Sequence, residues 1–290
     1  MSTLGRDRRF DLSAYSLAAL EWGAGEPVLA LHGWLDNAGS FNLLAPRLAG
    51  CHVIALDSAG HGLSGSRSPD ASYNIWQEVG DVLDVADQLG WERFSLLGHS
   101  RGAAVSTLFA GAFPDRVKRM VYIDGGLPIL GQSEEAPENL ARSLTDARRL
   151  RTRQGRVFPT REAAIAERMD GFTSVNADAA AQLAERSLRA LEGGGWQWVS
   201  DQRLKARSEV RLNAEMVRAF IQKVSAPVLA FEASGGPFAG RADFVELIPL
   251  FSKLEIERLD GGHHLHLEGG EIAIAARALP FLASSSSRGS

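Results

Sequence analysis

The chain has 290 residues, 45% of them hydrophobic, and its 31 basic and 35 acidic residues give a net charge of −4. This balance excludes a strongly basic nucleic-acid binder and a protein held on an anionic membrane by charge, and the single Cys51 excludes an intramolecular disulfide and a multi-cysteine metal site. Without a recognisable secretory leader or a run of about 18 apolar residues, we expect a cytoplasmic protein with no membrane partner.

Short β-rich runs alternate with longer helical patterns in the first and last parts of the chain. The segment 75–90 carries Val79, Val82, Ala86 and Leu89 at the spacing of one helix face. This alternation predicts an α/β fold built on a mostly parallel, doubly wound sheet, with functional residues at the carboxyl ends of its strands. Strands are predicted at 28–33, 52–57, 94–100, 119–125, 227–233 and 254–260.

The alternation stops after the strand that ends near Asp124. Residues 128–220 instead carry helical stretches rich in Ala, Arg, Glu and Leu, which predict a helical cap inserted between two core strands. The core is therefore expected at 10–127 and 221–283. The serine-rich residues 284–290 are interpreted as a flexible tail.

One turn carries a candidate nucleophile. GHSRG at 98–102 fits the pattern Gly-x-Ser-x-Gly, in which two glycines let a strand turn sharply into a helix and raise the serine above the sheet. The preceding FSLL supplies a strand and the following AAVSTLFAGAF supplies a helix, so the context favours this elbow over an ordinary glycine turn. Ser100 is the predicted nucleophile.

A serine hydroxyl needs a base to remove its proton, and DGGHHLHLE at 260–268 offers three histidines. Three histidines also raise the possibility of a metal site, but neither HExxH nor another ligand spacing accompanies them, so no metal is expected. His263 directly follows two glycines, whereas His264 and His266 are expected to begin the final helix. We therefore predict His263 as the base.

These motifs together resemble the α/β-hydrolase superfamily over about residues 10 to 283. More narrowly, the chain is similar to the serine hydrolase-like proteins and their bacterial relatives. This similarity lies in HGWLDNAGSF and in WQWVSDQRLK of the predicted cap. The motifs that carry the superfamily resemblance are HGW at 32–34, DSAGHGLS at 57–64, GHSRG at 98–102 and GGHHLHLE at 261–268.

The resemblance implies roles for the residues around the serine. The backbone N–H groups of Trp34 and Arg101 are expected to form the oxyanion hole. The Arg101 side chain has two possible roles: it could brace the structure or contact an anionic group of the substrate. His32 is interpreted as bracing its loop rather than as a second base, and Asp57 as a structural hydrogen-bonding residue rather than a catalytic acid.

The third triad member departs from the family pattern. The usual acid position, just past the strand PVLAFEA, falls on Gly236, which has no carboxylate. Some members of the superfamily carry the acid one strand earlier, where this chain has Asp124. We predict that Asp124 orients the catalytic histidine, with Glu232, Asp243 or no effective acid as the alternatives.

The predicted activity is that of a cofactor-independent carboxylic ester hydrolase with a Ser-His-Asp triad. A serine at the elbow excludes the branches that use aspartate there, the haloalkane dehalogenases and epoxide hydrolases. The expected substrate is a small-molecule ester or thioester with a small or medium acyl chain, held by His32, Trp34, Phe41 and cap residues.

Three alternatives remain: a carbon–carbon bond hydrolase or lyase with the same triad, a cofactor-free dioxygenase, and a non-catalytic ligand-binding member of the fold. The missing standard acid favours the last, whereas Ser100 and His263 oppose it. No nucleic-acid partner is expected, and the chain is expected to be a monomer or a homodimer.

Overall fold

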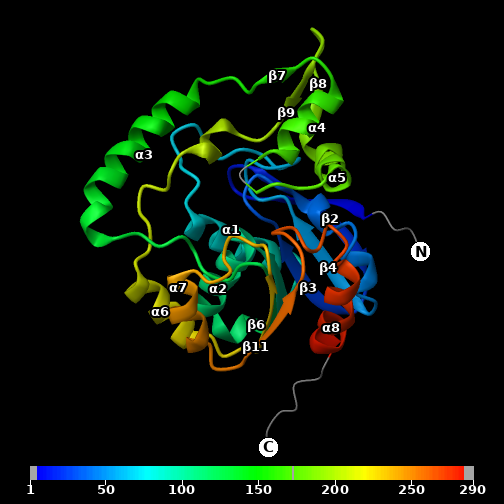
Figure 1. Cartoon of the computed structure of the whole chain (residues 1–290), viewed down its shortest axis with the longest axis vertical. Helices are drawn as coiled ribbons and strands as arrows, with labels where there is room; N and C mark the ends of the chain where they lie inside the picture. The colour runs from blue at the N-terminus through cyan, green and yellow to red at the C-terminus, as the bar shows by residue number, and fades with distance from the viewer. Residues whose placement is uncertain (1–4, 172, 284–290) are drawn as a thin grey trace, which may run out of the picture.

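The computed structural model describes residues 5–171 and 173–283, and it is built around one eight-stranded sheet. The strand order is β1-β2-β4-β3-β5-β6-β10-β11 (Figure 1). The strands are β1 (Arg6–Asp11), β2 (Ser16–Gly23), β3 (Glu26–Leu31), β4 (Cys51–Leu56), β5 (Phe94–His99), β6 (Val117–Ile123), β10 (Val228–Ala233) and β11 (Leu254–Leu259).

Neighbouring strands from β4 to β11 run parallel, whereas β1 pairs with β2 and β2 with β4 in antiparallel register. The predicted mostly parallel α/β fold and its six strands are therefore confirmed. β1 and β2 were not predicted. β1 reads RDRRFD and lies at the sheet edge with most of its residues exposed, so it has no apolar run to reveal it.

Helices cover both faces of the sheet, as a doubly wound fold requires. One face packs against α1, α2 and α6 through a cluster that includes Val85, Leu108 and Ile221. The other packs against α8 through Ile274 and Ala278. The core helices are α1 (Ile75–Gln88), α2 (Arg101–Ala112), α6 (Ala214–Lys223), α7 (Ala242–Leu247) and α8 (Glu271–Ala283).

The cap lies over the carboxyl ends of the central strands (Figure 1). It contains α3 (Ala136–Arg151), α4 (Arg161–Met169) and α5 (Ala177–Ser187). It also holds a small antiparallel sheet of order β7-β9-β8 that the sequence did not predict. Its strands are β7 (Val157–Phe158), β8 (Leu188–Ala190) and β9 (Trp196–Trp198).

The packing changes the expected domain boundaries. Helix α6 lies inside the predicted cap range 128–220, yet its Val217 and Ile221 are buried in the core cluster beside α2. The core therefore resumes at α6 rather than at residue 221, and at the other end it already includes β1. The predicted tail at 284–290 lies outside the described residues.

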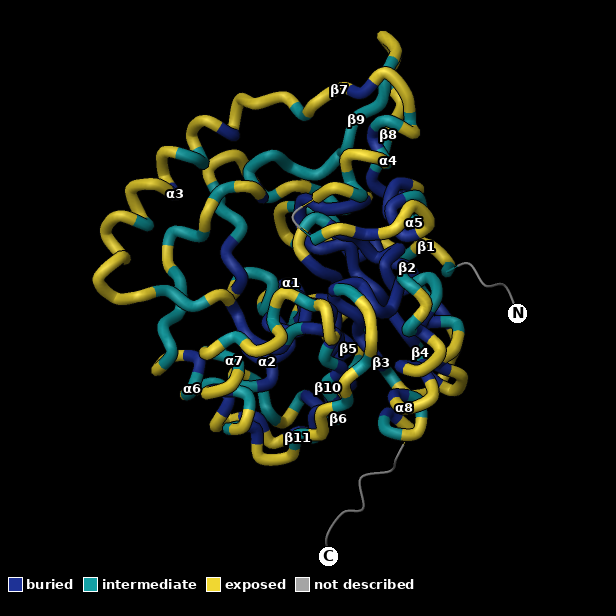
Figure 2. Tube along the Cα trace, viewed as in Figure 1, coloured by how far each residue is buried: buried dark blue, intermediate teal, exposed yellow. Residues whose placement is uncertain are grey.

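Burial follows these layers. The central strands are dark and buried in Figure 2, whereas the outer side of α3 is exposed. None of the described helices is long and apolar enough to cross a lipid bilayer.

Candidate active site

The predicted elbow lies between β5 and α2. Ser100 has φ +51°, a conformation rare for a residue with a side chain, and its N–H donates to the Ile123 carbonyl at 3.0 Å. A Cβ at Gly98 would lie 2.4 Å from the Ala103 backbone, and one at Gly102 would lie 2.0 Å from the Leu31 carbonyl oxygen. Both glycines are therefore required by close packing, and the turn places Ser100 at the carboxyl end of β5.

His263 and Asp124 meet beside this serine. The His263 Nδ1–H donates to Asp124 Oδ2 at 2.5 Å, and both side chains are buried. The second carboxylate oxygen, Oδ1, accepts from the Ala233 N–H at 3.2 Å. This hydrogen bond holds the carboxylate in one orientation, with Oδ2 directed at the imidazole.

Steric crowding explains why glycine occupies position 236, the usual position of the acid. A Cβ at Gly236 would lie 2.4 Å from Asp124 Oδ2. The Asp124 carboxylate thus occupies the space that a side chain at 236 would need. A side chain at 236 would therefore require the Asp124 carboxylate to move from its present position.

The other candidate acids do not face the imidazole. Glu232 accepts from Arg258 Nε at 2.8 Å on the exposed side of the sheet edge. Asp243 pairs with the neighbouring Arg241. Asp57 is fully buried and its carboxylate binds the Arg186 side chain and two backbone N–H groups, which is a structural role.

The predicted oxyanion loop follows β3. Trp34 is 40% exposed, and its Nε1–H donates to the Leu204 carbonyl of the cap at 3.0 Å. The next residue, Leu35, has φ +62°, and its N–H donates to His61 Nε2 at 3.2 Å. Helix α2 begins at Arg101, so the backbone N–H of this residue is among those that a helix leaves unpaired at its start.

Three residues of the site share an unusual backbone conformation. Among the described residues, non-glycine positive φ angles occur at Leu35 (+62°), Ser100 (+51°) and Asp124 (+39°). Such conformations cost about 1–3 kcal/mol each and tend to cluster at functional sites. Their coincidence at the predicted oxyanion loop, nucleophile and acid makes this edge of the sheet the candidate functional edge.

The Arg101 side chain contacts α1 and the residues before it. Its Nε–H donates to Glu78 Oε1 at 2.9 Å, and Nη2 lies 3.5 Å from the Tyr73 carbonyl oxygen. The guanidinium therefore braces α1 and the segment before it. Of its two readings from the sequence, the geometry favours the structural one.

Of the three predicted pocket residues, only Trp34 is accessible. His32 is 2% exposed, and its ring bridges the Gly33 carbonyl at 2.7 Å and the Ser58 N–H at 3.0 Å. Phe41 is fully buried, with its ring 5.5 Å from that of His266. In this structure His32 is a loop brace and Phe41 a core residue, so neither is exposed to a ligand.

Several buried histidines surround the site, and α8 begins only at Glu271, so His264 and His266 lie in the turn before it. Burial lowers the pKa of His99 to about 3 and lowers the pKa values of His61 and His266 well below their ordinary value. We call His61, His99 and His266 the neutral histidines. Neither ring nitrogen of His266 has a hydrogen-bond partner among the described residues.

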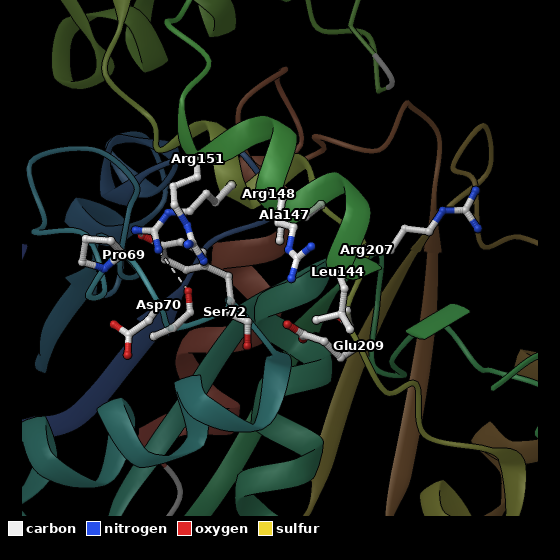
Figure 3. Close-up of a pocket in the computed structure, with 14 residues that line it drawn as sticks. Pro69, Asp70, Ser72, Leu144, Ala147, Arg148, Arg151, Arg207 and Glu209 are labelled. Carbon is white, nitrogen blue, oxygen red and sulfur yellow. Dashed lines mark hydrogen bonds between the residues drawn. The ribbon is translucent and has the colours of Figure 1, made fainter. Parts of the chain in front are cut away.

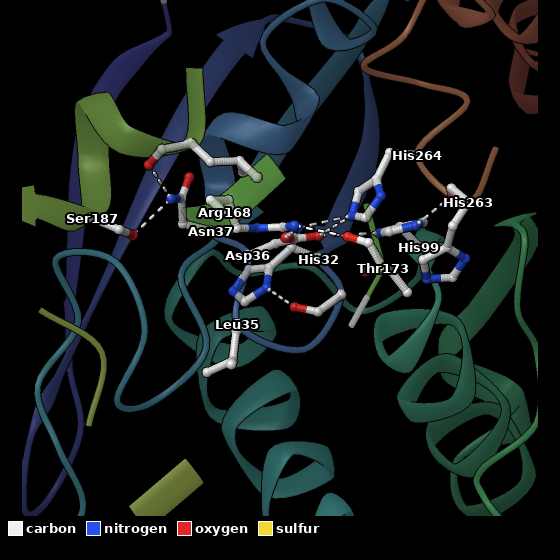
Figure 4. Close-up of polar contacts among 12 residues, drawn as sticks. His32, Leu35, Asp36, Asn37, His99, Arg168, Thr173, Ser187, His263 and His264 are labelled. Carbon is white, nitrogen blue, oxygen red and sulfur yellow. Dashed lines mark hydrogen bonds and ion pairs between the residues drawn. The ribbon is translucent and has the colours of Figure 1, made fainter. Parts of the chain in front are cut away.

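A polar network lies beside His263, the predicted base (Figure 4). Asp36, His99 and His264 each place a potential metal-ligand atom within 4.8 Å of one another. Arg168, from the cap helix α4, donates through Nη2 to Asp36 Oδ1 at 2.8 Å and lies 3.3 Å from His264 Nε2. A protein cation thus already neutralises this cluster.

A separate cavity of about 270 Å³ lies between α3 and the segment before α1 (Figure 3). Its lining includes Arg148 and Arg151 of α3 together with Tyr73 and Arg203. Neither Ser100 nor His263 lines this cavity.

The comparisons with known proteins show the family to which the chain belongs. A family model described as the alpha/beta hydrolase fold matches residues 26–270. The chain belongs to the α/β-hydrolase fold family. A serine hydrolase-like protein of Danio rerio is 31% identical over 277 residues, which cover 90% of this hydrolase and 83% of the relative. Serine hydrolase-like protein 2 of Homo sapiens is 32% identical over 238 residues, covering 79% and 76%.

The fold of the hydrolase also has a close structural counterpart. The crystal structure of a hypothetical protein from Pseudomonas aeruginosa PAO1 is 43% identical, with a TM-score of 0.92 and coverage of 96% of this chain and 99% of that one. The predicted resemblance to serine hydrolase-like proteins is confirmed.

Sequence reasoning missed part of the site of this hydrolase. His61 supports the oxyanion loop, and Asp36, His99 and Arg168 form the network behind His263. Asp36 and His99 lie within the motifs HGWLD and GHSRG, so their proximity to the site could have been inferred. Nothing in the sequence around Arg168 indicates its partner.

Proposed function

We propose that the protein is a serine hydrolase that cleaves a carboxylic ester or thioester of small or medium acyl chain through an acyl-enzyme on Ser100. The observation that carries this proposal is the 2.5 Å hydrogen bond between His263 Nδ1 and Asp124 Oδ2 beside the elbow. With the proton of the neutral ring held on Nδ1, the Nε2 lone pair is free to accept the proton of a serine hydroxyl.

The proposed reaction has two halves. Ser100 Oγ attacks the acyl carbon while His263 Nε2 takes the hydroxyl proton, and the protonated ring then gives this proton to the leaving alcohol or thiol. A water molecule next attacks the acyl-enzyme and loses a proton to His263, which passes it to Ser100 Oγ as the carboxylic acid leaves. Asp124 stabilises the imidazolium formed in each half.

The developing negative charge on the acyl oxygen needs hydrogen-bond donors. We assign this role to the backbone N–H groups of Trp34 and Arg101, each of which would lower the barrier by about 3–4 kcal/mol. Because Leu35 is held by His61 and Trp34 by the cap, the loop that presents the first donor is fixed before substrate binds.

A chain-length series of p-nitrophenyl esters tests the proposal. The wild-type protein is expected to hydrolyse short or medium esters and to react with a fluorophosphonate probe, and Ser100→Ala is expected to do neither. A wild-type protein that stays unlabelled where a control esterase reacts would refute the proposed function. Labelling without hydrolysis of any ester or thioester would retain the nucleophile and refute the substrate class.

A further inference from the structure

The carboxylate of Asp36 is a buried anion behind the active site. Its side chain is 1% exposed, and burial alone would raise its pKa. The neighbouring His264 and Arg168 nevertheless hold the pKa of Asp36 well below its ordinary value. A buried charge of this kind persists only while its partners stay in place.

This carboxylate contacts residues adjacent to two triad members. Asp36 Oδ2 accepts from His264 Nε2 at 3.1 Å, and His264 directly follows His263 in the chain. The same oxygen lies 3.6 Å from Nδ1 of His99, the residue before Ser100. The His99 Nε2–H donates to the His263 carbonyl at 3.0 Å, and the rings of His99 and His263 lie 4.6 Å apart.

Among the residues that the structure describes, Arg168 is the one from the cap that joins this network. It lies on α4, and its side chain is 14% exposed. Nη2 donates to Asp36 Oδ1 at 2.8 Å, while Nη1 donates to the Thr173 carbonyl at 2.9 Å within the cap. One guanidinium therefore ties the end of α4 to the loop after β3 and, through Asp36, to the loop that carries His263.

We propose that Arg168 is a positioning residue of this hydrolase, which fixes the His263 imidazole through Asp36 and His264 and so makes catalysis depend on the seating of the cap helix α4. The inference rests on the proposed function. Arg168 needs no contact with the substrate for this role. Removing its charge leaves Asp36 as a buried anion with incomplete pairing, and the carboxylate is then expected to shift together with His264.

Two variants of matched size and location test this role. Arg168→Met keeps the length of the side chain and removes the charge. Arg161→Met makes the same change on the same helix, where Arg161 pairs with Glu185 near the surface. The second-order rate of fluorophosphonate labelling reports the competence of Ser100 and His263 without an ester substrate.

Labelling of Arg168→Met is expected to be about 10- to 100-fold slower than that of the wild type, the cost of a small misplacement of a reacting group. The kcat for a p-nitrophenyl ester should fall in parallel while KM changes less than threefold. Arg161→Met should stay within twofold. Arg168→Lys, which cannot reproduce both guanidinium contacts, should lie between, and millimolar guanidinium should partly restore Arg168→Ala.

A structural brace alone gives a different pattern. If Arg168→Met melts at a lower temperature but its folded fraction is labelled at the wild-type rate, the proposal is overturned.

A second readout does not depend on activity. The His263 Nδ1–H, bonded to buried Asp124, should give a far-downfield proton NMR signal in the wild type and in Arg161→Met, and this signal should shift or disappear in Arg168→Met. An unchanged signal refutes the positioning role even if the wild type proves inactive, whereas an unlabelled wild type with the predicted NMR change refutes only the proposed function.

Discussion

Replacing Asp124 with asparagine tests the assignment of the acid most directly. Oδ1 of this carboxylate accepts from the Ala233 N–H, so in Asp124→Asn the amide oxygen must take that position. The NH2 group then faces His263 Nδ1, where the wild type has an acceptor at 2.5 Å. Because two donors cannot face each other, the imidazole proton moves to Nε2, and the ring can no longer accept the Ser100 proton.

The expected loss is about 10⁴-fold in kcat, which corresponds to about 5 kcal/mol of barrier. The assay is the steady-state hydrolysis of the best p-nitrophenyl ester, with circular dichroism to show that the variant is folded. The change preserves shape, so the melting temperature should move far less than the activity.

Two variants serve as controls for this prediction. Glu232→Gln and Asp243→Asn alter the other candidate acids, both of which pair with arginines away from the imidazole, and each should keep kcat within twofold. If Asp124→Asn retains more than a tenth of the wild-type kcat, the tautomer argument fails and Asp124 is not the acid.

Three further predictions concern the same edge of the sheet. Gly236→Asp alone should impair folding because its Cβ would lie 2.4 Å from Asp124 Oδ2. Asp124→Gly combined with Gly236→Asp should be at least tenfold more active than Asp124→Gly alone, since glycine suits the positive φ at 124. Equal kcat values for these two variants would contradict the exchange of the acid between the two positions. Arg101→Met should keep kcat within fivefold, because in the proposed mechanism only the backbone amide of this residue serves the reaction. Urea denaturation should show a free energy of unfolding lower by about 1–3 kcal/mol, because the pair with Glu78 is broken. A hundredfold loss of kcat would instead indicate that the Arg101 side chain takes part in the reaction. The neutral histidines have lowered pKa values in the folded state, so they take up protons on unfolding as the pH falls through 6.5, and together they should lower the free energy of unfolding by about 4 kcal/mol between pH 7.5 and pH 5.5. Burial raises the pKa of Asp81 to about 6, so proton uptake by this carboxylate in the folded protein opposes a part of that fall. His266→Leu should remove about a third of that fall, and an unchanged pH dependence would show that His266 is not neutral in the folded protein.

The sequence predicted the central strands well because they are buried on both faces and read as continuous apolar runs. It did not reveal β1, whose charged residues lie at an exposed edge, nor the strands of the cap, which are two or three residues long and exist only because they pair with one another. Helix α6 was assigned to the cap because nothing in its pattern shows that Val217 and Ile221 pack beside α2.

The same limit applies to the site. Ser100 and His263 lie in compact motifs, so local sequence identifies them. Asp124 was predicted because the usual acid position holds a glycine. The structure shows that the Asp124 carboxylate occupies the space which a side chain at 236 would need. The contact of Arg168 with Asp36 could not be predicted from the sequence. The two residues lie far apart in the chain, and no local pattern encodes how the cap is placed over the core.

The placement of Asp124 on the strand after the elbow also affects when the chemistry can begin during synthesis. Nucleophile and acid belong to one βαβ unit, β5-α2-β6, whose contacts form locally, whereas His263 follows β11 and is separated from Asp124 by 139 positions. On the ribosome, a chain that has folded only this unit holds a serine without a base, and such a hydroxyl is nearly inert. On the proposed mechanism the reactive centre is completed only when β11 is in place, so a chain that lacks β11 would carry no activated serine.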